Sequence, residues 1–106
     1  MSIRRSRTQP YEKGRGFEYK VKRHLEGVGY TVFRSGGSRG PADLVAIKRD
    51  EVLLIQCRLH GYLNPKRRER LRVLAGNLGA RAILAYREGR RLTLEEIWGG
   101  GGGGGR

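Results

Sequence analysis

The stretches GPADLVAI, residues 40–47, and VLLIQCRL, residues 52–59, decide the fold of this 106-residue chain. Both are almost continuously apolar, which is typical of strands that are covered on both faces of a sheet. Asp43 opens the first stretch, and Gln56 and Arg58 are placed in the second so that a strand would direct both to one face. Burying such groups without partners costs about 1–3 kcal/mol each. We therefore expect these polar residues to form a site.

The flanking sequence predicts the remaining elements. Apolar residues recur at helical spacing after Gly16 and predict a helix that ends at Gly27, with a buried stripe of Phe17, Val21, Leu25 and Val28. Strands are predicted at residues 30–34, 43–48 and 52–59. Asn64 and Pro65 then start a second helix that stops at Gly79, with a buried stripe of Leu71, Leu74, Ala75 and Leu78. Further strands follow at residues 80–86 and around 91–94.

This order of helix, three strands, helix and two strands predicts a single small α/β domain with a mixed central sheet flanked by helices. We place the domain at residues 13–98, after a basic flexible arm at residues 1–12. The glycine run that begins at residue 99 cannot pack a core, and residues 99–106 are predicted to be a disordered tail.

The charge of the chain indicates a polyanionic partner. It has 23 Lys and Arg residues against 10 Asp and Glu, a formal net charge of +13, which favours nucleic acid over other partners. A ribosomal or RNA-binding protein would show the same balance. The single cysteine, Cys57, excludes an internal disulfide and a cysteine-based zinc site. No signal peptide or apolar segment of about 20 residues occurs, so we expect a cytoplasmic protein of a reducing, DNA-containing compartment without a membrane partner.

Four motifs occur in the order KGRGFE (13–18), GYTVFRSGGS (29–38), DLVA (43–46) and IQCR (55–58). Together they resemble the archaeal-type Holliday-junction resolvases of the PD-(D/E)xK nuclease superfamily, over residues 13–86. The resemblance implies a restriction-endonuclease-like fold, a bound Mg²⁺ with Mn²⁺ as an alternative, a homodimer, and paired cuts across a four-way junction of double-stranded DNA. It also implies a nucleoid-associated protein of prokaryotic, archaeal or viral origin.

The resemblance also implies site residues. Glu18 matches a glutamate on the first helix, Asp43 matches the aspartate, and Gln56 and Arg58 stand where the family has a Glu-x-Lys pair. The implied catalytic set is Glu18, Asp43, Gln56, Arg58 and Ser38, and the implied metal ligands are Asp43, Gln56, Glu18 and the Cys57 carbonyl. Gln56 lacks a negative charge, so metal affinity should fall. Arginine does not lose its proton as lysine can, so Arg58 is a poor general base.

Basic residues around the proposed site are expected to contact the DNA backbone. The predicted set is Arg4, Arg5, Arg7, Lys13, Arg34, Ser35, Arg39, Lys66 and Arg67. For the basic residues that begin the second helix, the alternative is an ordinary solvated helix face.

Each site residue also has a structural alternative. Asp43 follows Gly40-Pro41 and would serve as a turn residue. Glu18 and Lys22 have the spacing of a surface ion pair on a helix. For Gln56 and Arg58 the alternative is a strand face that is open to solvent. Cys57 is expected to be a small core residue. Trp98 is expected either to plug the core or to lie at a dimer contact.

Two other functions fit the same residues. One is a junction-binding protein with weakened catalysis, which the residues Gln56 and Arg58 suggest. The other is a nuclease of the same fold that acts on other branched or duplex DNA.

Overall fold

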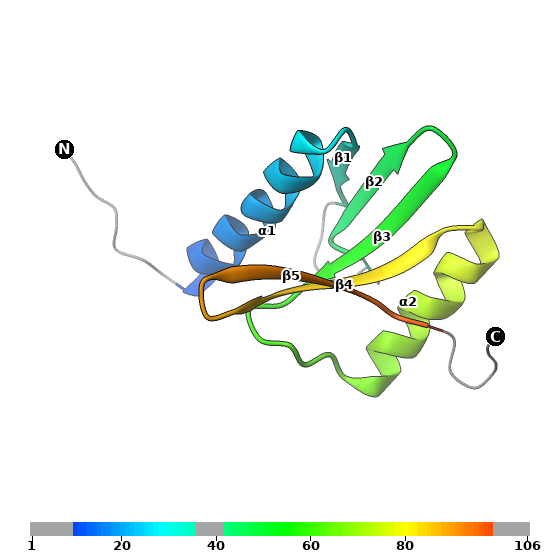
Figure 1. Cartoon of the computed structure of the whole chain (residues 1–106). Coiled ribbons are helices and arrows are strands. Elements are labelled where there is room, and N and C mark those ends of the chain that lie inside the picture. Colours follow the sequence, from blue (N-terminus) through cyan, green and yellow to red (C-terminus); the bar gives the residue numbers. More distant parts are fainter. Residues whose placement is uncertain (1–9, 36–41, 99–106) are drawn as a thin grey trace.

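The computed structural model describes residues 10–35 and 42–98, with side chains from residue 16 onward. The elements occur in the predicted order, helix, three strands, helix, two strands (Figure 1). They are α1 (Pro10–Gly27), β1 (Thr31–Arg34), β2 (Leu44–Lys48), β3 (Glu51–Cys57), α2 (Pro65–Leu78), β4 (Arg81–Glu88) and β5 (Arg91–Glu96). The prediction of a small α/β domain with a mixed sheet is therefore confirmed.

The five strands form one sheet in the order β1-β2-β3-β4-β5. Neighbouring strands are antiparallel except β3 and β4, which are parallel and are connected through α2. A parallel pair needs a long crossover connection, and the 14-residue helix α2 supplies it. The sheet is mixed because this single crossover joins the antiparallel strands β1, β2 and β3 to the antiparallel pair β4 and β5.

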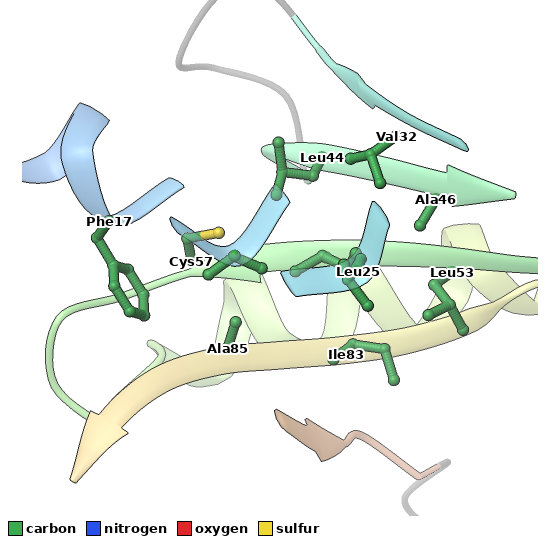
Figure 2. Packing of buried hydrophobic residues seen from close by; sticks show 11 residues of the cluster. Phe17, Leu25, Val32, Leu44, Ala46, Leu53, Cys57, Ile83 and Ala85 are labelled. Atoms are coloured by element: carbon green, nitrogen blue, oxygen red, sulfur yellow. The ribbon is translucent and has the colours of Figure 1, made fainter. Parts of the chain in front are cut away.

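The two helices cover opposite faces of the sheet. Helix α1 packs through Phe17, Val21 and Leu25 on alternate residues of β2 and β3. Cys57, the last residue of β3, belongs to this cluster (Figure 2). Leu71 and Ala75 of α2 pack on the other face in a second cluster. Because side chains alternate along a strand, the odd-numbered residues of β3 face α1, whereas Leu54 faces α2.

Strand β3 is the centre of both layers. All of its residues from Leu53 to Cys57 are buried, which explains why its sequence is nearly continuous in apolar residues. Strand β2 alternates between the two clusters, and its partner β1 is a short strand at the edge of the sheet. The candidate site lies where β3 ends and β2 begins.

Both ends of α2 follow the predicted signals. The side chain of Asn64 accepts a hydrogen bond from the backbone N–H of Lys66 at 2.8 Å, and Pro65 occupies the first turn, where no intrahelical donor is needed. Gly79 ends the helix in the left-handed region, at φ 68°. A residue with a Cβ is strained there, so glycine suits this position.

Three expectations need correction. Helix α1 begins at Pro10, inside the stretch predicted as a flexible arm, because proline fits the first position of a helix. Val28 and Leu78 were predicted to be buried, but they lie at helix ends and are 50% and 60% exposed. Trp98 is 75% exposed and does not plug the core.

In the described residues no helix is long and apolar enough to cross a membrane.

Leucines at two positions of α2 test the packing. We expect Leu71→Ala to lower the free energy of unfolding by about 2–5 kcal/mol, because Leu71 is fully buried and its truncation leaves a cavity. The matched control Leu78→Ala, on the same helix but 60% exposed, should change it by less than about 0.5 kcal/mol. Urea unfolding followed by circular dichroism measures both, and equal losses would contradict this packing.

Candidate active site

Asp43 joins the start of β2 to the end of β3. One of its carboxylate oxygens, Oδ2, accepts a hydrogen bond from the Cys57 N–H at 2.8 Å and another from the Gln56 side-chain amide at 3.0 Å. Its backbone N–H donates to the Ile55 carbonyl at 2.7 Å, and its carbonyl accepts from Ser35 N–H at 2.9 Å. Asp43, which directly precedes β2, therefore forms hydrogen bonds with β3 and with the residue that follows β1, and it is not only a turn residue.

Gln56 is the one buried polar or charged side chain among the described residues, at 3% exposure. It shares the α2-facing side of β3 with Leu54, and the register sets β2 beside it. The alternative of a solvated strand face is thus wrong for Gln56. A buried amide normally has a hydrogen-bond partner, and here the partner is Asp43.

Glu18 reaches the site from the other layer. Its carboxylate forms an ion pair with Arg34 at 3.2 Å, and Arg34 lies opposite Leu44 in the register of β1 and β2. Lys22 pairs instead with Glu26 at 2.9 Å. The alternative of a surface pair between Glu18 and Lys22 is therefore wrong, and the Glu18 carboxylate instead reaches Arg34, opposite the first residue of β2.

The Cys57 thiol is buried at the end of β3, and its pKa is raised. Burial raises the pKa of this thiol, the carboxylates of Asp43 and Glu18 raise it further, and the Arg58 guanidinium lowers it. Cys57 itself is a small core residue, as predicted, and Figure 2 shows it in the cluster that contains Phe17 and Leu44.

Arg58 follows the last residue of β3. Its backbone N–H donates to the Ala85 carbonyl at 2.9 Å, so it still lies against β4. Its side chain is half-buried, and within residues 16–35 and 42–98 it has no carboxylate partner at salt-bridge distance. A guanidinium in this position is available to an anionic ligand such as a phosphate.

Several predicted DNA contacts have a defined place. Arg34 is on β1 beside the site, and Lys66 and Arg67 are exposed in the first turn of α2. Ser35 is half-buried and donates its hydroxyl to the Ala42 carbonyl, so it ties the two ends of the loop together. The other predicted residues fall outside the described side chains: Arg4, Arg5, Arg7, Lys13, Ser38 and Arg39.

The oxygen atoms at this end of β3 suit a divalent cation in kind. The Asp43 carboxylate, the Gln56 amide and the Cys57 carbonyl are hard oxygen donors of the type that Mg²⁺ prefers. The Cys57 carbonyl faces the Asp43 side, because the N–H of the same residue does so and the two groups of a strand residue point the same way. The donor set is poor in charge, and in the described part of the chain no three His, Cys, Asp or Glu residues converge on a metal position.

Two cations beside the site were missed by the sequence analysis. Lys20 of α1 and Arg87 of β4 line a cavity of about 340 Å³ together with Phe17 and Leu59. The Arg87 N–H also donates to the Leu59 carbonyl at 3.4 Å, which brings β4 next to the segment after β3. No local motif marks either residue, because only the packing of α1 against the sheet brings them together.

Comparisons with known proteins agree with this fold. A family model of archaeal Holliday junction resolvases, Hjc, matches residues 9–97. A crossover junction endodeoxyribonuclease Hjc from Methanocaldococcus jannaschii is 37% identical over 81 residues, which covers 73% of this chain and 60% of that relative. The solved structure of Archaeoglobus fulgidus Hjc, a Holliday junction resolvase, superposes with a TM-score of 0.70 at 24% identity, over 80% of this chain and 73% of that one. At this identity the structural match speaks for the fold alone.

The two bonds to Asp43 predict different costs for two substitutions. Asp43→Ala should lower the free energy of unfolding by about 1–3 kcal/mol, because it leaves the N–H of Cys57 and the amide of Gln56 without an acceptor. Asp43→Asn keeps an acceptor oxygen in place and should cost less. Chemical unfolding of both variants tests this, and equal losses would show that the hydrogen bonds do not stabilise the fold.

Proposed function

Because the chain belongs to the archaeal Holliday junction resolvase family, we propose that it binds four-way DNA junctions and cleaves them as a structure-selective endonuclease. The observation that carries this proposal is the contact of Asp43 with the end of β3. There it contacts Gln56, one of the residues that the resemblance identified, and the backbone of Cys57, which directly precedes Arg58. The names of the relatives describe junction-cleaving enzymes, and the shared fold supports that activity here.

The family implies the use of a divalent metal ion, and we propose Mg²⁺, with Mn²⁺ as a substitute. Asp43, Glu18 and the Cys57 carbonyl would hold it, and Gln56 would join them only if its amide, whose NH₂ group faces Asp43, turned its oxygen toward the ion. When bound, the ion would supply Lewis acidity at the scissile phosphate. Glu18 would first have to share its carboxylate with Arg34, to which it is paired at 3.2 Å.

The other site residues would act on the phosphate. Arg58, which directly follows Cys57 at the end of β3, would neutralise charge that develops on the phosphate. It would not abstract a proton, because an arginine remains protonated. Ser38 is proposed to contact the scissile phosphate from the loop between β1 and β2, and this role rests on the resemblance alone.

Binding would depend on the shape of the DNA backbone more than on base sequence. The net charge of +13 supports backbone contacts. The proposed contacts include the predicted basic residues of the arm, of β1 and of the first turn of α2. Lys20 and Arg87 add two cations at the cavity beside the site. Such contacts make affinity fall steeply as salt is raised.

We further propose a homodimer in the cytoplasm, because a four-way junction needs two symmetric cuts and each chain offers one site. Exposed apolar side chains support a self-contact around α2 and the end of β5. Val73 and Leu78 are 43% and 60% exposed, and Trp98 at 75% lines a cavity of about 280 Å³ with Ile97. Apolar groups gathered in this way favour a protein contact.

A junction assay tests the activity. We expect the wild-type chain to bind a synthetic four-way junction more tightly than a linear duplex of the same sequence and to cleave it when Mg²⁺ is added. Asp43→Asn should keep junction binding and lose at least about a hundredfold in cleavage rate, since one ligand charge is removed. Equal cleavage by both proteins would contradict the role of Asp43. Preference for linear duplex would favour a nuclease with another substrate.

Sedimentation tests the dimer. We expect the wild-type chain to sediment as a dimer and Trp98→Glu to weaken self-association by at least about tenfold, because a buried unpaired charge is costly. Tyr19→Glu places the same charge on α1, where Tyr19 is 57% exposed, and should leave the dimer unchanged. A monomeric wild-type chain at all concentrations would contradict the proposal.

A further inference from the structure

We propose that the Gln56 side chain lies in the position beside Asp43 where a cation would bind. It thereby keeps divalent metal out of the site in the free protein. Its amide group takes the place against Asp43 that a metal ion would otherwise take. The inference rests on the proposed function, since it concerns the same site. It adds that divalent metal binds the free protein weakly, because the Gln56 amide must first leave its contact with Asp43.

The orientation of the amide follows from the chemistry of its partner. The Asp43 oxygen at 3.0 Å is a carboxylate oxygen, which can only accept a hydrogen bond. The NH₂ group of Gln56 must therefore face Asp43, and the amide oxygen faces away from it. In this orientation Gln56 is a donor to Asp43 and not a second oxygen ligand beside it.

Burial makes this contact hard to replace. Gln56 is 3% exposed, so water does not compete well for its amide. The same Asp43 oxygen also accepts the Cys57 N–H at 2.8 Å. A cation that binds this oxygen must displace the Gln56 amide, or must turn it so that its oxygen faces the ion.

The charges around the site are already balanced. Glu18 forms an ion pair with Arg34 at 3.2 Å, and a second guanidinium, that of Arg58, directly follows Cys57, whose N–H donates to Asp43. The formal charges of these two carboxylates and two guanidinium groups cancel without any metal ion. A divalent cation therefore finds no excess of negative charge, although charge is what draws Mg²⁺ to a carboxylate site. The same two guanidinium groups suit a DNA phosphate.

These contacts predict the behaviour of the free protein. Glutamate at position 56 would bring a second carboxylate to the 3.0 Å contact with Asp43, and a cation would then be needed to hold the two together. Glutamine instead lets the site fold and pack without metal. Gln56 is thus a positioning residue for metal, and it sets how readily the ion enters.

The experiment measures Mn²⁺ binding without DNA. Isothermal titration and the Mn²⁺-dependent shift of the thermal unfolding midpoint are compared for the wild-type chain and Gln56→Glu. We expect Gln56→Glu to bind Mn²⁺ on the order of a hundredfold more tightly, and its midpoint to rise with Mn²⁺ far more than that of the wild type. Asn77→Asp, the same amide-to-acid change at an exposed position of α2, should bind as the wild type does.

Gln56→Ala tests whether the Gln56 amide blocks the metal ion or binds it as a weak ligand. If the amide blocks the ion, Gln56→Ala binds Mn²⁺ at least as well as the wild type. If the amide oxygen is a ligand, Gln56→Ala binds more weakly, and the proposal is overturned. It is also overturned if the wild type and Gln56→Glu bind Mn²⁺ equally. Should Gln56→Glu fold only when Mn²⁺ is present, that supports the proposal, and should it not fold at all, the Gln56→Ala comparison decides.

Junction binding in EDTA keeps the two proposals apart. We expect the wild type to bind a four-way junction equally well in EDTA and in Mg²⁺. If it binds the junction but Mn²⁺ affinity does not respond to position 56, only the inference on Gln56 fails. If it binds no junction under either condition, the proposed function itself fails.

Discussion

The burial of β3 on both faces is the constraint on which the rest of this structure depends. A central strand must give every backbone group a partner, since no water reaches it. Strands β2 and β4 supply those partners along most of its length. At its end, where β2 begins, the Asp43 side chain takes over and accepts the N–H of Cys57. The residue that completes the sheet is therefore the residue that defines the candidate site.

This double role changes how the site is understood. An aspartate that only bound metal would be poorly satisfied in the free protein, because a half-buried carboxylate without partners is unstable. Here Asp43 is satisfied by the Cys57 backbone and by the Gln56 amide. Glu18 is satisfied in the same way by Arg34. The site is thus a stable part of the fold before any ligand arrives, and a ligand must compete with internal partners.

Much of the fold could be predicted because its signals are local. The periodicity of Phe17, Val21 and Leu25 predicts α1, and the cap residues Asn64 and Gly79 bound α2. The predictions failed at element ends. Val28 and Leu78 continue the apolar spacing of their helices, but each lies at or past the last turn, where the sheet no longer covers it. Spacing alone does not report where a covering layer stops.

For the site, the sequence by itself determined which residues lie at the ends of β2 and β3 and how strongly basic the chain is. These properties are read along the chain, and strand alternation predicts that Gln56 and Arg58 share one face. Only the tertiary structure decided which of these side chains pair with one another. Glu18 pairs with Arg34 rather than Lys22, and the Gln56 amide donates to Asp43. Such pairings depend on distances between elements that are remote in sequence, and those distances arise only when both helices pack on the sheet.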